Sequence, residues 1–168
     1  MHVLHLIKGL GLGGAENLLV EAARHAGPEV RYSFAYFLPW KDALVAPLRA
    51  AGAEVTCFPA KGAAGLLARV PALARHLRRR RVDLLHAHLP LAGVAGRLAG
   101  RLAGVPVVYT EHNLMQRYHP LTRAANLATW RLQRQAVAVS AEVAASIAAR
   151  AGAAVPVAVV ANGVPVDR

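Results

Sequence analysis

The chain has little cysteine, few aromatic side chains and few acids: one cysteine, 5% aromatic residues and nine Asp or Glu among 168 positions. A single cysteine excludes an internal disulfide framework and a four-thiolate zinc site, and it points to a reducing compartment. Every longer apolar stretch is interrupted by Arg, His, Gly or Pro before it could cross a bilayer. No positively charged segment precedes the apolar start of the chain, as it would in a secretory signal. We therefore expect a soluble, cytoplasmic protein.

Positive charge is in excess, with 20 Lys or Arg and a formal net charge of +11. This balance favours an anionic partner, such as a phosphorylated substrate, an anionic membrane surface or nucleic acid. Because the chain lacks an RNA-binding motif and an aromatic stacking platform, a nucleic-acid-binding module is the least favoured hypothesis. Residues 78–81 are four consecutive arginines, which are typical of a solvated helix end. The same run leaves open a peripheral association with the inner face of a membrane.

Short β-type runs alternate with helix-length segments along the whole chain, which is the pattern of parallel βαβ units. With 55% hydrophobic residues and no linker, residues 1–168 are predicted to form one α/β domain. We expect a single Rossmann-like, doubly wound, mainly parallel sheet of about seven strands. The predicted strands are 2–7, 30–38, 54–58, 82–86, 107–110, 136–140 and 157–161. The predicted helices are 15–26, 41–51, 64–81, 91–103, 121–135 and 141–150.

The predicted helix 91–103 contains Gly96 and Gly100, and Gly104 follows at the same spacing. A glycine inside a helix costs about 1 kcal/mol relative to alanine. We interpret this stripe as a close approach of the helix to the sheet.

A doubly wound sheet usually has the strand order 3-2-1-4-5, so strands one and four are neighbours and a crevice opens beyond their carboxyl ends. Unusual residues follow three of the predicted strands. They lie in residues 8–16 (KGLGLGGAE), 86–90 (HAHLP) and 110–113 (TEHN). These three distant segments are predicted to meet in one cleft.

Residues 8–16 form a glycine-rich turn before a predicted helix, which suits a phosphate or a sugar hydroxyl. Residues 9–14 also match the pattern GxGxxG, so a stand-alone nucleotide- or NAD-binding enzyme is the second hypothesis. That pattern requires an acid about 20 residues later, at the end of the second strand. Here the strand runs into Leu38, and Asp42 is equally suited to cap the next helix. A plain structural turn is a further alternative.

His86 and His88 are two residues apart, so on an extended segment they point the same way and could exchange hydrogen bonds with a polar substrate near neutral pH. Residues 111–123 mix His, Arg and Tyr and suit a substrate loop, or an ordinary solvated one. With Glu111 and His112 the two histidines could instead form a metal site. We favour no metal, because the adjacent glycine turn suits an organic anion better.

Five segments, in this order and at this spacing, resemble the N-terminal, acceptor-side domain of the retaining family 4 glycosyltransferases. Those enzymes have two Rossmann-like domains in the GT-B arrangement. The segments are GGAE (13–16), DLLHAHLPLAG (83–93), GVPVVYTEHN (104–113), AVSAEVAASI (138–147) and VVANGVPVDR (159–168). The resemblance implies transfer of a sugar from a nucleotide-sugar donor to an acceptor hydroxyl, with retained anomeric configuration and no required metal or other cofactor.

The resemblance also implies roles for individual residues. His88 would lie beside the transferred sugar, with His86 supporting it, and these two are the predicted catalytic residues. Ser140 and Asn162 would lie near the cleft between the two domains. A sugar or a lipid-linked molecule would be the acceptor. The predicted substrate-binding residues are Gly13, Gly14, Glu111, His112, Asn113 and Arg117.

The main departure from the family is length, because a donor-binding domain would follow a segment like residues 162–164. We expect that domain to be absent from this chain and present in the full-length protein. We accordingly expect the isolated chain to have little or no transferase activity.

Overall fold

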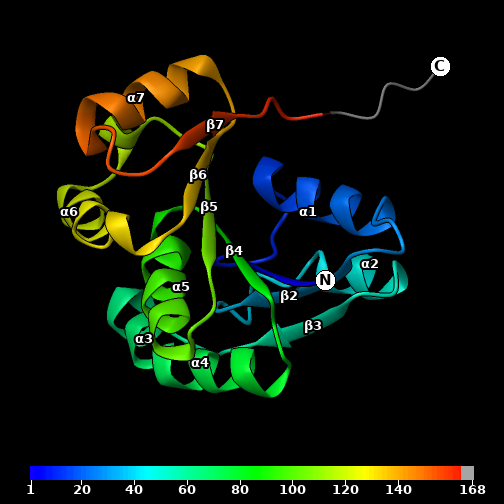
Figure 1. Cartoon of the computed structure of the whole chain (residues 1–168). Coiled ribbons are helices and arrows are strands. Elements are labelled where there is room, and N and C mark those ends of the chain that lie inside the picture. The colour runs from blue at the N-terminus through cyan, green and yellow to red at the C-terminus, as the bar shows by residue number, and fades with distance from the viewer. Residues whose placement is uncertain (164–168) are drawn as a thin grey trace.

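Seven parallel strands form one sheet in the order β3-β2-β1-β4-β5-β6-β7 in the computed structural model, which describes residues 1–163 (Figure 1). This arrangement confirms the predicted α/β class and the predicted central order. The crossover after β3 carries the chain to the other side of β1, so β1 and β4 are neighbours. The strands are β1 (His2–Leu6), β2 (Arg31–Tyr36), β3 (Glu54–Cys57), β4 (Leu84–His88), β5 (Val107–Glu111), β6 (Gln135–Ala138) and β7 (Val157–Val159).

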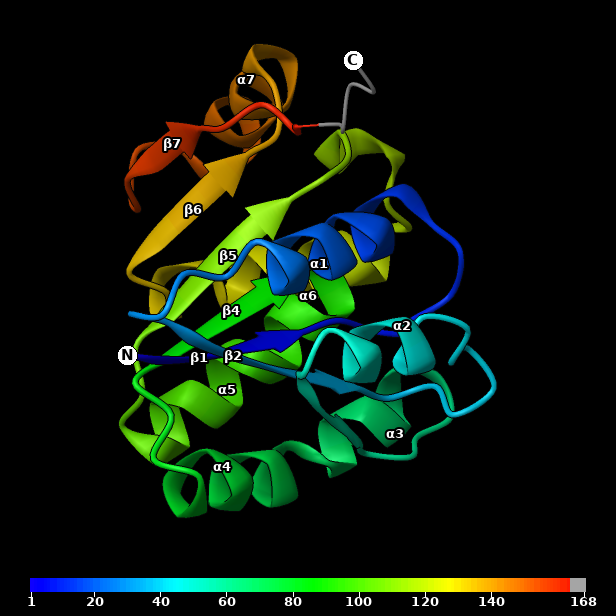
Figure 2. The ribbon, with the colours of Figure 1, turned by 90° about the vertical axis from the view of Figure 1, so that its right-hand side faces the viewer.

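Helices cover both faces of the sheet, as a doubly wound fold requires (Figures 1 and 2). One buried cluster contains Leu19 and Leu48 under the first two helices, and the other contains Leu73 and Ile147 under later ones. Leu4 and Leu6 of β1 lie in the second cluster, and Ile7, directly after the strand, lies in the first. The helices are α1 (Gly14–Arg24), α2 (Val45–Ala50), α3 (Gly62–Ala68), α4 (Val70–Arg79), α5 (Pro90–Ala103), α6 (Pro120–Ala128) and α7 (Ala141–Ala151).

The fourth strand begins and ends two residues later than the predicted 82–86. It runs from Leu84 to His88, because the ladder to β5 continues as far as the pairing of His88 with Thr110. His86 and His88 therefore lie within the strand and not after it. Similarly, β5 extends to Glu111, one residue beyond the prediction.

Three helix predictions were wrong in extent. The segment 64–81 is two helices, α3 and α4, and the second begins with Pro71 in its first turn, where the missing N–H of proline costs nothing. The segment 121–135 ends as an α-helix at Ala128 and continues as a 3-10 turn, Trp130–Leu132. The segment 41–51 is helical only from Val45, because Lys41 and Leu44 form backbone hydrogen bonds with Leu10 of the glycine turn instead.

The glycine stripe on α5 has two different causes. A Cβ on Gly100 would lie 2.4 Å from Val107 Cγ2, and one on Gly96 would lie 3.1 Å from Ala87, so these two allow the predicted close approach. A Cβ on Gly104 would meet no atom within 4 Å, so this glycine is not needed for a close approach. It ends the helix at φ +76°, a left-handed conformation that glycine adopts without strain. Gly93, which the spacing did not single out, makes room for the Tyr109 ring at 2.7 Å from a built Cβ.

Within residues 1–163, no helix has both the length and the apolar character needed to span a membrane. Asn162 and Gly163 are exposed and follow β7 outside any regular element. The remainder of the predicted family segment, from Val164 onward, lies outside the described residues.

Candidate functional site

The carboxyl ends of β1, β4 and β5 meet at one edge of the sheet. Leu6 pairs with Ala87 across β1 and β4, and His88 pairs with Thr110 across β4 and β5. Leu89, directly after β4, packs against the buried cluster that contains Leu10 of the glycine turn. The three segments that the sequence predicted to converge therefore do so.

Backbone strain marks the point where β4 ends. Leu89 adopts φ +67° and ψ 154°, a region that is almost restricted to glycine. Its N–H donates to the Thr110 carbonyl at 3.3 Å, and Pro90 begins α5 immediately afterwards. Because of this sharp turn, β4 ends at His88 and the chain continues directly into α5.

The glycine turn divides into a packed half and an open half. A Cβ on Gly9 would lie 2.9 Å from Lys41 Cβ, and the Leu10 N–H donates to the Lys41 carbonyl at 2.7 Å, so this half packs against the β2–α2 loop. Gly13 caps α1 without a side-chain hydrogen bond, and Gly14 is exposed, with no atom within 4 Å of a built Cβ. Gly14 thus leaves open space at the amino end of an 11-residue helix, where backbone N–H groups favour an anion. The carboxylate of Glu16, in the first turn, lies directly beside Gly13, so a Cβ on Gly13 would overlap it.

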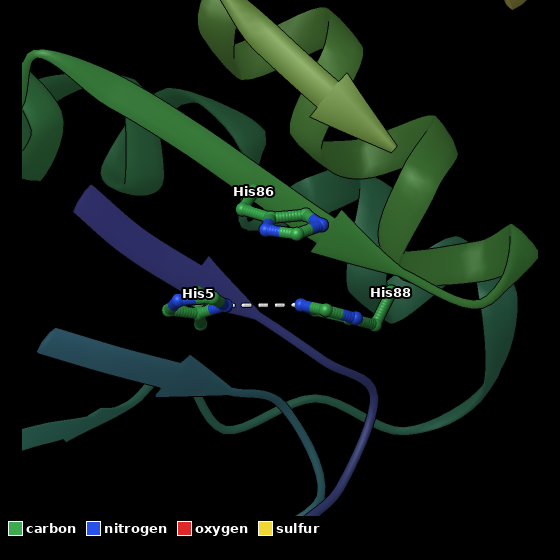
Figure 3. A group of neighbouring side chains, drawn as sticks. All are labelled: His5, His86 and His88. Atoms are coloured by element: carbon green, nitrogen blue, oxygen red, sulfur yellow. Dashed lines mark hydrogen bonds between the residues drawn. The ribbon is translucent and has the colours of Figure 1, made fainter. Parts of the chain in front are cut away.

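Four imidazole rings lie side by side at this edge. His5 Nδ1 and His88 Nε2 share a hydrogen bond of 3.0 Å (Figure 3). On the other side of the ring, His88 Nδ1 lies 3.2 Å from His112 Nε2. His86 stacks on His88 with ring centroids 4.3 Å apart, and its Nε2 lies 2.7 Å from Thr110 Oγ1. Both nitrogens of His88 are therefore engaged by other histidines. His112, which is only partly buried, is the member of this hydrogen-bonded series nearest to the loop.

Burial keeps these histidines neutral. Desolvation lowers the pKa of His112 to about 4, and desolvation together with the neighbouring His112 lowers the pKa of His86 to about 4. Desolvation and the three neighbouring imidazoles hold the pKa of His88 well below its usual range. At neutral pH the edge therefore presents neutral hydrogen-bonding groups.

Glu111 supports the loop that follows β5. Its carboxylate is fully buried and accepts hydrogen bonds from the hydroxyls of Tyr118 and Tyr109, the latter at 2.8 Å. The backbone N–H groups of His112 and Asn113 also donate to it, at 3.1 and 3.3 Å. Desolvation raises the pKa of Glu111, while these hydrogen bonds oppose the rise.

The other predicted substrate-binding residues differ in exposure. Asn113 and Arg117 are exposed on the loop, and the substrate-binding role of each stays a prediction. Glu111 lies beneath them, with no exposed surface. Ser140 accepts a hydrogen bond from the Val143 N–H at 3.2 Å and so caps α7.

Three residues could hold a metal ion: His5, His86 and His88 each offer a nitrogen within 4.8 Å of the others. The alternative set with Glu111 is not supported, because that carboxylate already accepts four hydrogen bonds. The sequence analysis did not single out His5. It lies opposite His86 in the β1–β4 register. Strand adjacency was predictable, but the register that brings these two side chains together was not.

Comparisons with known proteins agree with this architecture. The sequence pattern of Glycosyltransferase Family 4 matches residues 1–168. Among solved structures, HepE of Anabaena in complex with UDP has a TM-score of 0.83 at 23% identity, over 98% of this chain and 44% of that one. The lipopolysaccharide outer core galactosyltransferase WaaB, in its apo form, has a TM-score of 0.77 at 13% identity, over 99% of this chain and 47% of that one.

A third similar structure is MurG of Acinetobacter baumannii, with a TM-score of 0.61 at 18% identity over 82% of this chain and 41% of that one. The chain thus spans less than half the length of these structures. No curated protein sequence matches it significantly.

Proposed function

Because the chain belongs to Glycosyltransferase Family 4, we propose that residues 1–168 are the acceptor-binding half of a retaining GT-B glycosyltransferase. The donor would be a nucleotide-sugar and the acceptor a hydroxyl group of a sugar or a lipid-linked molecule. The observation that carries the proposal is the convergence of the open glycine turn, His88 and the Glu111-supported loop at one sheet edge. The ligands of one structural neighbour also support it, since HepE is described with UDP and with UDP-glucose.

The chemistry of the edge suits a transfer in which the protein positions two substrates. In a front-side retaining reaction the leaving phosphate accepts the proton of the acceptor hydroxyl, so no carboxylate nucleophile is required. Glu111 is buried and fully hydrogen-bonded, which suits support and not nucleophilic attack. Neutral His112, which contacts His88, would hydrogen-bond a sugar hydroxyl, and backbone N–H groups at the amino end of α1 would bind the diphosphate.

The donor side of the cleft would come from a second domain, which in this family lies on the C-terminal side of the acceptor domain. Residues 1–168 alone would then bind an acceptor without turning it over. The basic charge of the chain fits a cytoplasmic location, with residues 78–81 in contact with an anionic membrane. That run precedes β4, so it lies at the opposite end of this strand from His88.

Binding by the isolated chain tests the proposal. Two-dimensional NMR spectra are recorded during titration with a panel of sugars, UDP-glucose and NAD. We expect shifts centred on Gly13, Gly14, His112 and Asn113, and no turnover when donor and acceptor are mixed. Gly14→Ala should weaken the response without changing stability, whereas Gly163→Ala serves as a matched control.

Two results would contradict the proposal. Chemical-shift changes confined to other parts of the chain would show that the acceptor does not bind at this edge. Micromolar binding of NAD, with no response to sugars or UDP-glucose, would favour the stand-alone dinucleotide-binding enzyme instead.

A further inference from the structure

An open hollow lies beside the amino ends of β5 and β6. Its volume is about 540 Å³, and its walls come from the end of α5, the turn into β5 and the segment from Arg131 to Arg134 that precedes β6. Because β5 starts here at Val107 and ends at Glu111, the hollow and the candidate substrate site lie at opposite ends of this strand. A hollow of this volume is large enough for a small molecule.

Three arginines line the hollow: Arg101 at the end of α5, and Arg131 and Arg134 before β6. All three are exposed, and within residues 1–163 none of them has an ion-pair partner. None of the described residues that line the hollow is acidic. Like charges that converge without a counter-charge favour a multivalent anion.

The carboxyl end of α5 opposes this positive potential only in part. A helix carries about half a negative charge at that end, against three full positive charges on the arginines. The Gly100 carbonyl already accepts the N–H groups of Gly104 and Val105, the latter at 3.0 Å, and the Leu102 carbonyl accepts a hydrogen bond from Arg78. The hollow therefore stays positively charged.

A buried amide adds hydrogen-bond donors to the same hollow. Gln133 lines it and is only 6% exposed. The Gln133 Oε1 accepts a hydrogen bond from Arg97 Nη1 at 2.7 Å, whereas the Gln133 Nε2 is buried and has no hydrogen-bond partner within residues 1–163. Because the contact with Arg97 requires the oxygen, the amide cannot be reversed to satisfy the nitrogen. An acceptor from outside the chain would satisfy it.

Arg97 makes an anionic acceptor more favourable than a neutral one. Arg97 is fully buried and stays charged at neutral pH, although burial lowers its pKa to about 10. Its hydrogen bond to Gln133 Oε1 polarises the amide, so the N–H groups at the other end become stronger donors. The hollow thus combines three exposed guanidinium groups with one buried, polarised donor.

We propose that Arg101, Arg131, Gln133 and Arg134 form a binding site for a diphosphate group, carried by a small soluble molecule or by a lipid headgroup. Guanidinium groups donate two parallel hydrogen bonds to phosphate oxygens, and the buried amide would donate to a further oxygen. The volume leaves room for the part of the molecule that carries the phosphates. The site goes beyond the proposed transfer reaction and does not depend on it.

Titration of the full chain with inorganic pyrophosphate tests the site at physiological ionic strength. Two-dimensional NMR spectra report the side-chain amide of Gln133 directly, and we expect saturable shifts of this group and of the backbone at Arg131 and Arg134. Gln133→Glu should weaken binding by at least about 10-fold, because it keeps an acceptor for Arg97 but replaces the donor by a negative charge. Arg134→Gln should weaken it by about 5-fold.

Arg49→Gln is the matched control. It makes the same change of charge at an exposed arginine of α2, which packs on the other face of the sheet from α5, and we expect unchanged binding. Circular dichroism shows whether each variant folds. If Gln133→Glu does not fold, Arg131→Gln and Arg134→Gln decide the question.

Vesicles that contain phosphatidic acid distinguish the two sources of the phosphate group. Pyrophosphate binding that Gln133→Glu weakens, with no effect of this substitution on vesicle partitioning, assigns a soluble ligand. Vesicle partitioning that Gln133→Glu weakens, without pyrophosphate binding, assigns a lipid headgroup. Failure of the wild-type chain to bind either probe overturns the proposal, as does equal binding by the wild-type chain and the folded hollow variants.

Discussion

The guanidinium carbon of Arg97 lies 5.0 Å from the centre of the Tyr109 ring, inside the protein. Arg97 is fully buried, and burial lowers its pKa to about 10, so it is charged at neutral pH. The Tyr109 hydroxyl donates to Glu111. A buried cation on α5 is thus connected through one aromatic ring to the carboxylate that supports the candidate substrate loop.

Replacing Arg97 by methionine should destabilise the fold by roughly 3 kcal/mol. The guanidinium donates to Thr129 Oγ1 at 3.1 Å and to Gln133 Oε1 at 2.7 Å, and these acceptors would lose their donor. Urea unfolding measures the change. Arg101→Met, one turn later on α5 and exposed, is the control, and we expect a change within about 0.5 kcal/mol. Equal effects of the two substitutions would contradict a structural role for the buried cation.

Gly100→Ala should destabilise the protein by about 2 kcal/mol, because the new methyl group would overlap Val107 and the Val105 carbonyl. Gly14→Ala should leave stability unchanged or slightly raised, since its position in α1 is open. Thermal unfolding of both variants, monitored by circular dichroism, makes the comparison. A tolerated Gly100→Ala would mean that α5 does not approach the sheet as closely as described.

Glu111→Gln should loosen the loop after β5. An amide retains one acceptor oxygen where the carboxylate has two, so the donors from Tyr118 and Tyr109 can no longer both be satisfied. We expect a loss of about 2 kcal/mol in stability and faster amide hydrogen exchange in residues 112–118. Glu142→Gln, in the first turn of α7, is the control. Unchanged exchange in this loop would show that the carboxylate does not hold it.

Stability should fall as the pH is lowered from about 7 toward 4. The pKa of His86 and of His112 in the folded chain is about 4, below the ordinary histidine value of 6.5, so between these two values the unfolded chain binds more protons. Each histidine then contributes a slope of up to about 1.4 kcal/mol per pH unit. Urea unfolding from pH 7.5 to 4.5, with a chelator present, measures the slope for the wild-type chain and for His86→Gln. An equal slope in both would exclude His86 as a source of the pH dependence.

If residues 78–81 contact an anionic membrane, the chain should partition onto vesicles that contain phosphatidylserine. Replacing the four arginines by glutamine should reduce partitioning by at least about 10-fold, since each basic residue near such a surface contributes about 1 kcal/mol. The expected loss is below the full sum because Arg80 pairs with Glu54, and Arg78 donates to the Leu102 carbonyl. Replacing Arg24, Arg49, Arg123 and Arg150 controls for net charge. Sedimentation with vesicles measures the partitioning of both variants. Unchanged partitioning of the variant that lacks the arginines at 78–81 would contradict the membrane hypothesis.

The sequence by itself predicted the fold class, the strand order from β3 to β5 and the three segments that meet at one edge of the sheet. Those inferences rest on local patterns: alternation of strand and helix, glycine and proline at junctions, and the rule that parallel strands end at the same edge. Element ends were less predictable. At the early end of α6, for example, Thr129 Oγ1 and Gln133 Oε1 accept hydrogen bonds from Arg97, which is distant in sequence.

Only the tertiary structure decided which polar side chains are buried and already hydrogen-bonded within the fold. Arg97 and Arg101 are four residues apart on α5 and so share one helix face, yet one is buried and the other exposed. The sequence brought His86 and His88 together, but His5 joins them through strand register, and register depends on packing of whole strands against the core. Glu111 was predicted at the acceptor pocket, whereas its buried hydrogen bonds place it beneath the loop. Local sequence determines which elements form, and long-range packing determines which side chains remain free for chemistry.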